Sequence, residues 1–194
     1  MIKIIISGII SLLLLLASAH PAQAVLRYYS INDFEQTHRA HYLAGTAEDD
    51  YAGTYPTIPP WCQSSIVEDA SEARGKVLKI EYNVKGGRAG YRLSFDARSA
   101  DIFASANALS FFVRGKNVSF YVELDDGITH YSRVTVRTDQ WEEITIPYRD
   151  FSAPSFLSPR SIRTISFVVD TALLNEKKGA FFIDDILLRE VEEE

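Results

Sequence analysis

Cysteine is nearly absent from this chain: Cys62 is the only one among 194 residues, so no disulfide can form within the chain. Without a disulfide, an exported domain depends on its hydrophobic core or on a bound metal for stability. Cys62 has two interpretations, a catalytic thiol or a small buried hydrophobe beside Trp61. We favour the second, because free cysteines are among the most buried residues.

Basic charge is also in the minority. The chain carries 20 Lys and Arg against 26 Asp and Glu, which gives a net charge of −6. Nucleic acids select basic surfaces, and no basic stretch interleaved with aromatics occurs, so we exclude a nucleic-acid partner. After the opening residues no apolar run is long enough to cross a bilayer, so we expect no membrane span in the mature protein.

The one long apolar run lies at the start of the chain. Lys3 precedes the run from Ile4 to Ala17, and the AQA at Ala22 to Ala24 has the small–x–small pattern of a signal-peptidase site. This arrangement predicts a signal peptide over residues 1–24 and a mature chain of residues 25–194. An uncleaved anchor is the alternative. Either way we expect a periplasmic or secreted protein.

Helical periodicity is scarce, and an alternation of apolar and other residues takes its place. It runs through KVLKIEYNV, YRLSFDA, NVSFYVELDDG, ITHYSRVTVRT and TISFVVD, with turn signals such as the DDG at Asp125 to Gly127 between the runs. Period two with β-branched and aromatic residues is typical of strands. Seven or eight such strands predict an all-β fold, a single antiparallel β-sandwich of the jelly-roll type over residues 25–194.

Residues 37–73 are the exception, and we expect a long irregular insertion there. The segment is rich in Tyr, Pro, Ala and acidic residues and follows no period. A loop of this length inside a compact domain is usually functional or disordered, and the aromatics here argue against disorder. Trp61 is therefore a candidate ligand-binding residue, with a lid over the core as the alternative role for this segment.

The order of several short motifs resembles a known family. DFE near the start, then GKVLKIEY, QWEEITIPYRDF, IRTISFVV and GAFFIDDILL are together similar to family 11 carbohydrate-binding modules and related galactose-binding-like jelly rolls. The resemblance implies a polysaccharide held on a concave sheet, and Tyr91 matches a tyrosine that the family uses on the sugar. Assembly factors of mitochondrial complex I share related landmarks, so a protein-binding role is the alternative.

The resemblance also implies a structural calcium ion between the first and last strands. On this basis Glu35 and Asp184 are the side-chain ligands, and Asp33 is a further candidate. Carboxylates are the oxygen ligands that calcium prefers. Because strand residues alternate, we expect Asp184 and Asp185 to point to opposite faces. The alternative is that Asp184 bonds a loop and Asp185 is solvated.

A candidate ligand-binding face follows from the alternation. If Phe120 and Val122 point inward, Tyr121 and Glu123 point outward, and we expect Tyr131, Arg133 and Arg114 to join them. Aromatic rings cover the apolar C–H faces of sugars, while acids and guanidinium groups bond the hydroxyls. These residues therefore predict a shallow glycan groove. A solvated face with an ordinary cross-strand Glu–Arg pair is the alternative.

No set of catalytic residues stands out. Glu123 and Asp125 would face the same way, but nothing marks either one as a glycosidase acid, and no zinc spacing or nucleophile–base arrangement occurs. We therefore expect an exported, non-catalytic protein that binds a polysaccharide or other glycan. The alternative is a structural or assembly protein that uses the same sandwich to bind a protein partner.

Overall fold

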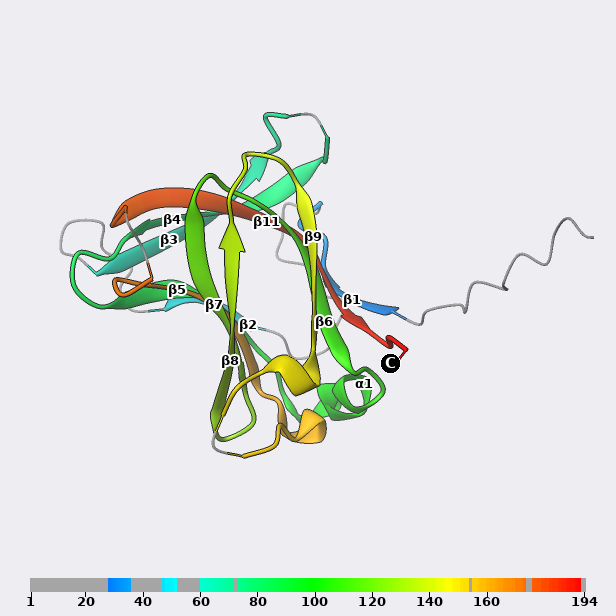
Figure 1. The fold of residues 1–194 in the computed structure, drawn as a ribbon. Helices are drawn as coiled ribbons and strands as arrows, with labels where there is room; N and C mark the ends of the chain where they lie inside the picture. Colours follow the sequence, from blue (N-terminus) through cyan, green and yellow to red (C-terminus); the bar gives the residue numbers. More distant parts are fainter. Residues whose placement is uncertain are drawn as a thin grey trace, which may run out of the picture.

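A computed structural model describes residues 28–35, 47–51, 60–71, 73–153, 155–173 and 176–192, with 47–51 described by its backbone alone. These residues form two antiparallel sheets that pack face to face, as the sequence predicted (Figure 1). The elements are β1 (Tyr28–Asn32), β2 (Ala47–Tyr51), β3 (Trp61–Glu68), β4 (Lys76–Asn83), β5 (Arg88–Ser94), η1 (Ala97–Ser99), α1 (Ala100–Ala104), β6 (Ala108–Arg114), β7 (Val118–Asp125), β8 (Thr129–Val136), β9 (Glu142–Pro147), η2 (Tyr148–Asp150), η3 (Pro159–Ser161), β10 (Thr164–Asp170) and β11 (Lys178–Arg189).

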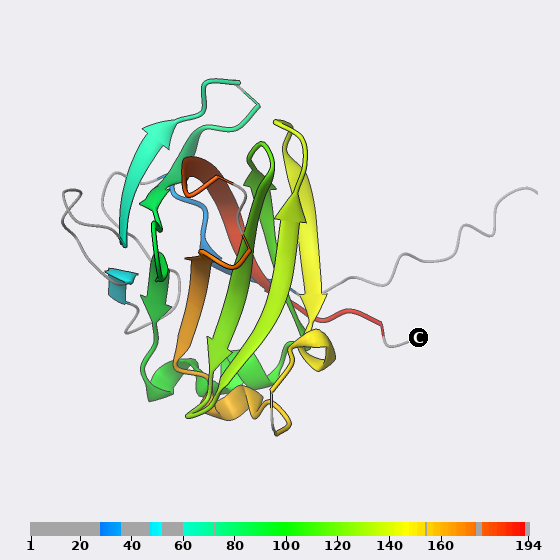
Figure 2. The same ribbon diagram turned by 60° about the vertical axis from the view of Figure 1, so that its left-hand side comes forward.

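The first sheet has six strands in the order β3-β4-β11-β6-β9, and β1 pairs with the far end of β11. The second sheet has five strands in the order β2-β5-β10-β7-β8. Figure 2 turns the outer face of the five-stranded sheet toward the viewer, with β2 at the left and β8 toward the right. The first and last strands are therefore neighbours, and each sheet has an outer face free to carry other chemistry.

The core lies between the two sheets and is filled by the apolar half of each alternating strand. Phe111 of β6 meets Phe167 of β10 edge to face, with ring centres 5.1 Å apart. Phe120 of β7 stacks on Phe181 of β11 at 4.7 Å, with the rings 15° from parallel. All four side chains are fully buried. Aromatic contacts across both sheets therefore fix how one sheet sits on the other.

Residues 37–73 are not irregular throughout, and our prediction was wrong for two parts of this segment. β2 adds to the edge of the five-stranded sheet beside β5, and β3 adds to the edge of the six-stranded sheet beside β4. An edge strand can be polar, since one of its sides faces water, so β3 shows only weak alternation. Cys62 on β3 is fully buried, in agreement with the interpretation as a small buried hydrophobe.

The predicted signal peptide over residues 1–24 lies outside the described residues. Within the described part of the chain, no helix is long and apolar enough to cross a membrane.

Candidate functional site

The outer face of the five-stranded sheet carries the residues that alternation predicted for it. Phe120, Val122 and Leu124 of β7 are buried in the core, so the residues between them point outward. In the register between β7 and β8, Tyr121 lies opposite Arg133 and Glu123 lies opposite Tyr131. Directly opposed residues of an antiparallel pair share a face. The structure therefore brings these four predicted residues together.

Two tyrosines form the aromatic part of this face. The rings of Tyr121 and Tyr131 meet edge to face with their centres 5.4 Å apart. Tyr131 is 46% exposed, which makes it one of the few large hydrophobic side chains left open among the described residues. Because Tyr121 supports it from the neighbouring strand, Tyr131 presents a ring whose position is set before any ligand arrives.

Arg88, at the start of β5, belongs to the same face and was missed in the sequence. Its guanidinium forms an ion pair with Glu123, lies 3.1 Å from Asp170, and sits 5.7 Å from the centre of the Tyr121 ring. Because the residue follows two glycines, the sequence suggests that it belongs to a turn. Its position as the first residue of an alternating strand was the signal that could have identified it.

A groove of about 520 Å³ continues this face toward the end where β7 begins and β8 ends. Leu173 and Glu176, from the connection between β10 and β11, form one wall, and the hydroxyls of Ser119 and Thr135 lie 2.9 Å apart on its floor. The side chains that line it are those of Asn117, Ser119, Arg133, Thr135, Arg137, Leu173 and Glu176. The aromatic pair and the groove therefore lie along the same two strands.

Three predicted ligand-binding residues do not belong to this face. Tyr91 of β5 is 1% exposed and lies opposite Phe167 in the register, so it points into the core. Trp61 begins β3 in the other sheet, and the alternation from buried Cys62 places it on the outer side of that sheet. Arg114 ends β6, also in the six-stranded sheet. The prediction for Tyr91 was wrong because the residue is buried, and the expected position of Arg114 beside Tyr121 was wrong because β6 belongs to the other sheet. A ligand-binding role for Trp61, which was predicted from the insertion, stays a prediction.

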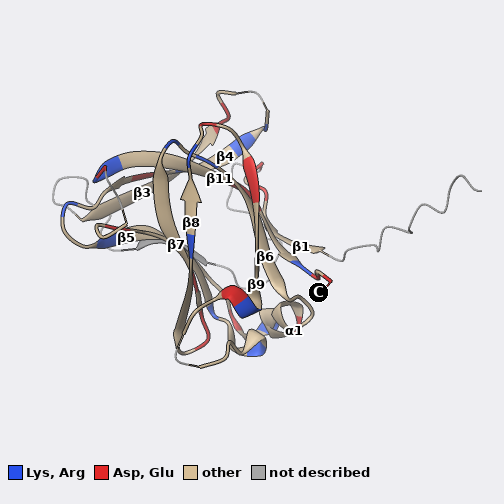
Figure 3. Cartoon of the chain, viewed as in Figure 1, with Lys and Arg blue, Asp and Glu red and all other residues tan. Residues whose placement is uncertain are grey.

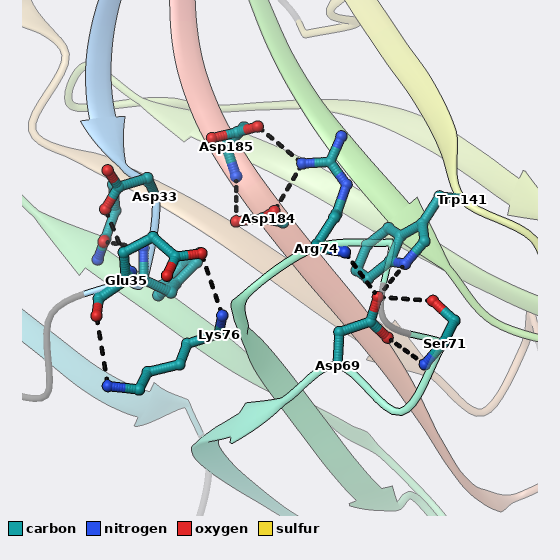
Figure 4. Close-up of polar contacts among 11 residues, drawn as sticks. Asp33, Glu35, Asp69, Ser71, Arg74, Lys76, Trp141, Asp184 and Asp185 are labelled. Atoms are coloured by element: carbon teal, nitrogen blue, oxygen red, sulfur yellow. Dashed lines mark hydrogen bonds and ion pairs between the residues drawn. The ribbon is translucent and has the colours of Figure 1, made fainter.

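Arg114 belongs instead to a polar cluster around Asp69 on the outer face of the six-stranded sheet. Figure 4 shows Asp69 of this cluster with Ser71 and Trp141. Its guanidinium lies 2.6 Å from Asp69, whose side chain is fully buried. Asp69 also accepts hydrogen bonds from Trp141 Nε1 at 2.9 Å and from the hydroxyl and backbone N–H of Ser71. Burial alone would raise the pKa of Asp69, but these hydrogen bonds and the charge of Arg114 outweigh it and hold the pKa well below its usual range.

Asp184 and Asp185 lie beside this cluster and share one partner. Nη1 of Arg74 is 2.6 Å from Asp184 and 2.7 Å from Asp185. The expectation that alternation separates the two acids was wrong, because β11 has a bulge here: its register shifts after Asp184, and Asp185 has a left-handed φ of 47°. Burial, opposed by the hydrogen bond from Arg74, raises the pKa of Asp184 to about 6.

The predicted calcium ligands do not converge as a calcium site requires. Glu35 accepts a hydrogen bond from the backbone N–H of Lys76, and Asp33 accepts one from the backbone N–H of Glu35. Within the described ranges no three His, Cys, Asp or Glu side chains are grouped closely enough to hold a metal ion. Calcium needs six to eight oxygen atoms around it, whereas a guanidinium contacts Asp184 here. The residues, as arranged here, therefore do not fit the calcium ion that the resemblance implied.

The sequence matches no protein-family model and no curated protein. Among solved structures, an exo-β-agarase is similar with a TM-score of 0.56 and 11% identity, over 86% of this chain and 26% of that one. A β-1,2-glucanase from Parabacteroides distasonis is similar with a TM-score of 0.50 and 14% identity, over 76% and 23%. This chain thus spans about a quarter of the length of those two enzymes.

Carbohydrate-binding modules also occur among the structural neighbours. A family 30 module of a cellulosomal cellulase from Clostridium thermocellum has a TM-score of 0.49 and 15% identity, over 76% of this chain and 99% of that one. At these identities the similarity to the two enzymes shows that the fold is shared, and no comparison identifies family 11.

Proposed function

We propose that this chain is an exported, non-catalytic glycan-binding protein whose binding surface is the outer face of the five-stranded sheet. The observation that carries the proposal is the exposed ring of Tyr131, supported by Tyr121, beside the ion-paired Arg88 and Glu123. Aromatic and paired polar groups stand together on one open surface. Export rests on the signal peptide predicted for residues 1–24.

The chemistry of this surface suits a sugar chain. Pyranose rings present apolar C–H faces that pack on aromatic side chains, and their hydroxyls both donate and accept hydrogen bonds. Arg88 is held in place from two sides, by Glu123 and by Asp170. Groups that are already oriented lose less conformational freedom when they bind a ligand. An ordinary cross-strand ion pair would not require an exposed aromatic ring beside it.

The comparisons supply independent support of a general kind. The two similar enzymes carry names that describe polysaccharide cleavage, and this chain corresponds to about a quarter of each. We propose that the fold serves carbohydrate recognition here as well.

The carboxylates of the face support a binding role over a catalytic one. Glu123 is paired with Arg88, while Asp125 accepts hydrogen bonds from the backbone N–H of Gly127 and the hydroxyl of Thr129. A glycosidase needs one carboxyl with a raised pKa and a second one free to attack or to activate water. Both of these carboxylates are already engaged, so we propose no hydrolytic step.

The experiment is a glycan array with the chain of residues 25–194, followed by titration calorimetry on the best ligand. Tyr131→Ala is expected to weaken binding about tenfold, which corresponds to the loss of roughly 1.4 kcal/mol of stacking energy. Tyr28→Ala is the matched control, because Tyr28 is 66% exposed but lies on β1 in the other sheet. Equal losses in both variants, or no binding to any glycan, would contradict the proposal.

One observation favours the alternative of a protein partner. The side chain of Phe156 is completely exposed, and Ile128 on the β7–β8 turn is 45% exposed. The backbone N–H of Ser158 bonds Asp126 at 2.6 Å, which holds the loop that carries Phe156 against this turn. Exposed apolar groups of this kind can mark a protein contact. A variant Phe156→Ser that keeps full glycan affinity but loses a copurifying protein would support this second role.

A further inference from the structure

The groove at one end of the candidate face carries charges that the aromatic pair does not explain. Arg133 and Thr135 lie on β8 in the same alternation as Tyr131, Arg137 follows at the end of the strand, and both arginines line the groove. Successive outward residues of a strand are about 6.6 Å apart, so the groove directly adjoins the Tyr131 ring. A ligand that stacks on Tyr131 and follows the strands enters it.

Among the described residues, the two arginines of the groove have no ion-pair partner, unlike several other arginines. Arg74, Arg88 and Arg114 each lie within ion-pair distance of two carboxylates. No carboxylate of the described residues lies within that distance of Arg133 or Arg137, and both side chains are exposed. The groove therefore holds two cations that no carboxylate of the described residues neutralises.

The charge of the groove is opposite to that of the chain. The net charge of the protein is −6, and Figure 3 shows acidic and basic segments interspersed over both sheets. The described lining of the groove has two arginines against one acid, Glu176 on the opposite wall. Two cations that line one groove repel each other, and an anion between them removes this repulsion. The planar guanidinium group can donate two parallel hydrogen bonds to the oxygens of a carboxylate or sulfate.

We propose that the groove selects an acidic polysaccharide, binding a carboxylate or sulfate group of the sugar through Arg133 and Arg137. This inference rests on the proposed function and names the ligand class for the same face. A sugar unit next to the one stacked on Tyr131 places its anionic group between the two arginines. The hydroxyls of Ser119 and Thr135 contact the same unit from the floor, and Glu176 accepts hydrogen bonds from its hydroxyl groups.

The test compares three sets of oligosaccharides by titration calorimetry: galacturonate oligomers, which carry carboxylates; sulfated galactan oligomers; and neutral cello- and agaro-oligosaccharides. We expect one acidic set to bind at least tenfold more tightly than the neutral sets. Arg133→Gln and Arg137→Gln should each reduce the affinity for it about tenfold, the loss expected for a charge-assisted hydrogen bond. Both variants should weaken the binding of neutral sugars less than that of the acidic set, since a neutral ligand lacks the anionic group that the arginines bind.

Arg149→Gln is the matched control, because Arg149 is an exposed arginine on η2, away from the groove, and its loss changes the net charge equally. A drop as large as that of Arg137→Gln would show general charge attraction and overturn the inference. Neutral sugars that bind as well as acidic ones, unaffected by either groove variant, would overturn it and leave the proposed function standing. Failure of every oligosaccharide to bind would overturn both. Thermal melts of each variant confirm that it is folded.

Discussion

The two outer faces of this sandwich contain the same kinds of side chain, but these side chains are buried and ion-paired on one face and more exposed on the other. The face of the six-stranded sheet combines Trp141 with Arg114, Arg74 and their acids, and the side chains of Asp69 and Arg114 are at most 9% exposed. The face of the five-stranded sheet combines Tyr121 and Tyr131 with Arg88, Arg133 and Glu123, and Tyr131 is 46% exposed. Composition alone does not distinguish them.

The difference lies in how far each face satisfies its own hydrogen bonds. On the first face, that of the six-stranded sheet, Trp141 and Arg114 donate hydrogen bonds to Asp69. Arg74 forms ion pairs with Asp184 and Asp185, and its guanidinium lies 3.6 Å from the centre of the Phe112 ring. In the second, Arg133 and Arg137 have no carboxylate partner among the described residues. The ion-paired cluster of the first face holds the turn between β3 and β4 against the sheet, whereas the second face retains arginines that can bind a ligand.

Of the variants that test this difference between the two faces, we expect Asp69→Asn to cause the largest loss of stability. The change removes the charge that Arg114 faces and disturbs the hydrogen bonds from Ser71 and Trp141. Breaking a buried pair by removing one partner costs about 3–5 kcal/mol of unfolding free energy, because the remaining charge is left uncompensated. Urea denaturation measures the loss. Arg133→Gln on the open face is the control and should change stability by less than about 0.5 kcal/mol. Similar losses in both would remove the distinction between the faces.

The next largest effect should come from Asp184→Asn, which should remove a loss of stability that the wild type shows as the pH rises. The pKa of Asp184 is raised from 3.8 to about 6, so the folded state favours the protonated form. Stability from this group is present below pH 4 and is lost as the pH rises to about 6, by up to roughly 3 kcal/mol. The wild type should therefore lose stability over this interval relative to Asp184→Asn. Melting temperatures at pH 4, 5, 6 and 7 measure the difference, and parallel curves for the two proteins would contradict it. Asp69, whose pKa is lowered, titrates below this range.

The alternation of β7 was enough to predict half of the open face from sequence. The order Phe120, Tyr121, Val122, Glu123 assigns each residue a side, and the structure agrees. The same reasoning places Tyr91 with Leu93 in the core, so the error on Tyr91 came from giving the family resemblance more weight than the alternation.

Other features depend on the tertiary arrangement, which local patterns do not contain. Arg114 correctly points away from the core, but the sequence does not reveal that β6 lies in the opposite sheet from β7. The bulge that brings Asp185 to Arg74 requires a left-handed φ at an aspartate, which alternation treats as an ordinary strand residue. The lack of a carboxylate partner for Arg133 and Arg137 within the described part of the chain likewise follows from their neighbours in space.

The smallest expected effect is the response of the protein to a chelator. A bound calcium ion that tied the first and last strands together would stabilise the folded state, and its removal would lower the melting temperature by several degrees. In this structure the cation beside Asp184 is the guanidinium of Arg74, which belongs to the chain and cannot be extracted. We therefore expect EDTA and added calcium to move the melting temperature by less than about 1 °C, against several degrees for the loss of even 1 kcal/mol. Arg74→Met provides the contrast, since it should lower the melting temperature by leaving Asp184 and Asp185 without their shared partner. A fall in EDTA that calcium reverses would show that Asp33, Glu35 and Asp184 rearrange around the ion, and the closed face would then be a metal site.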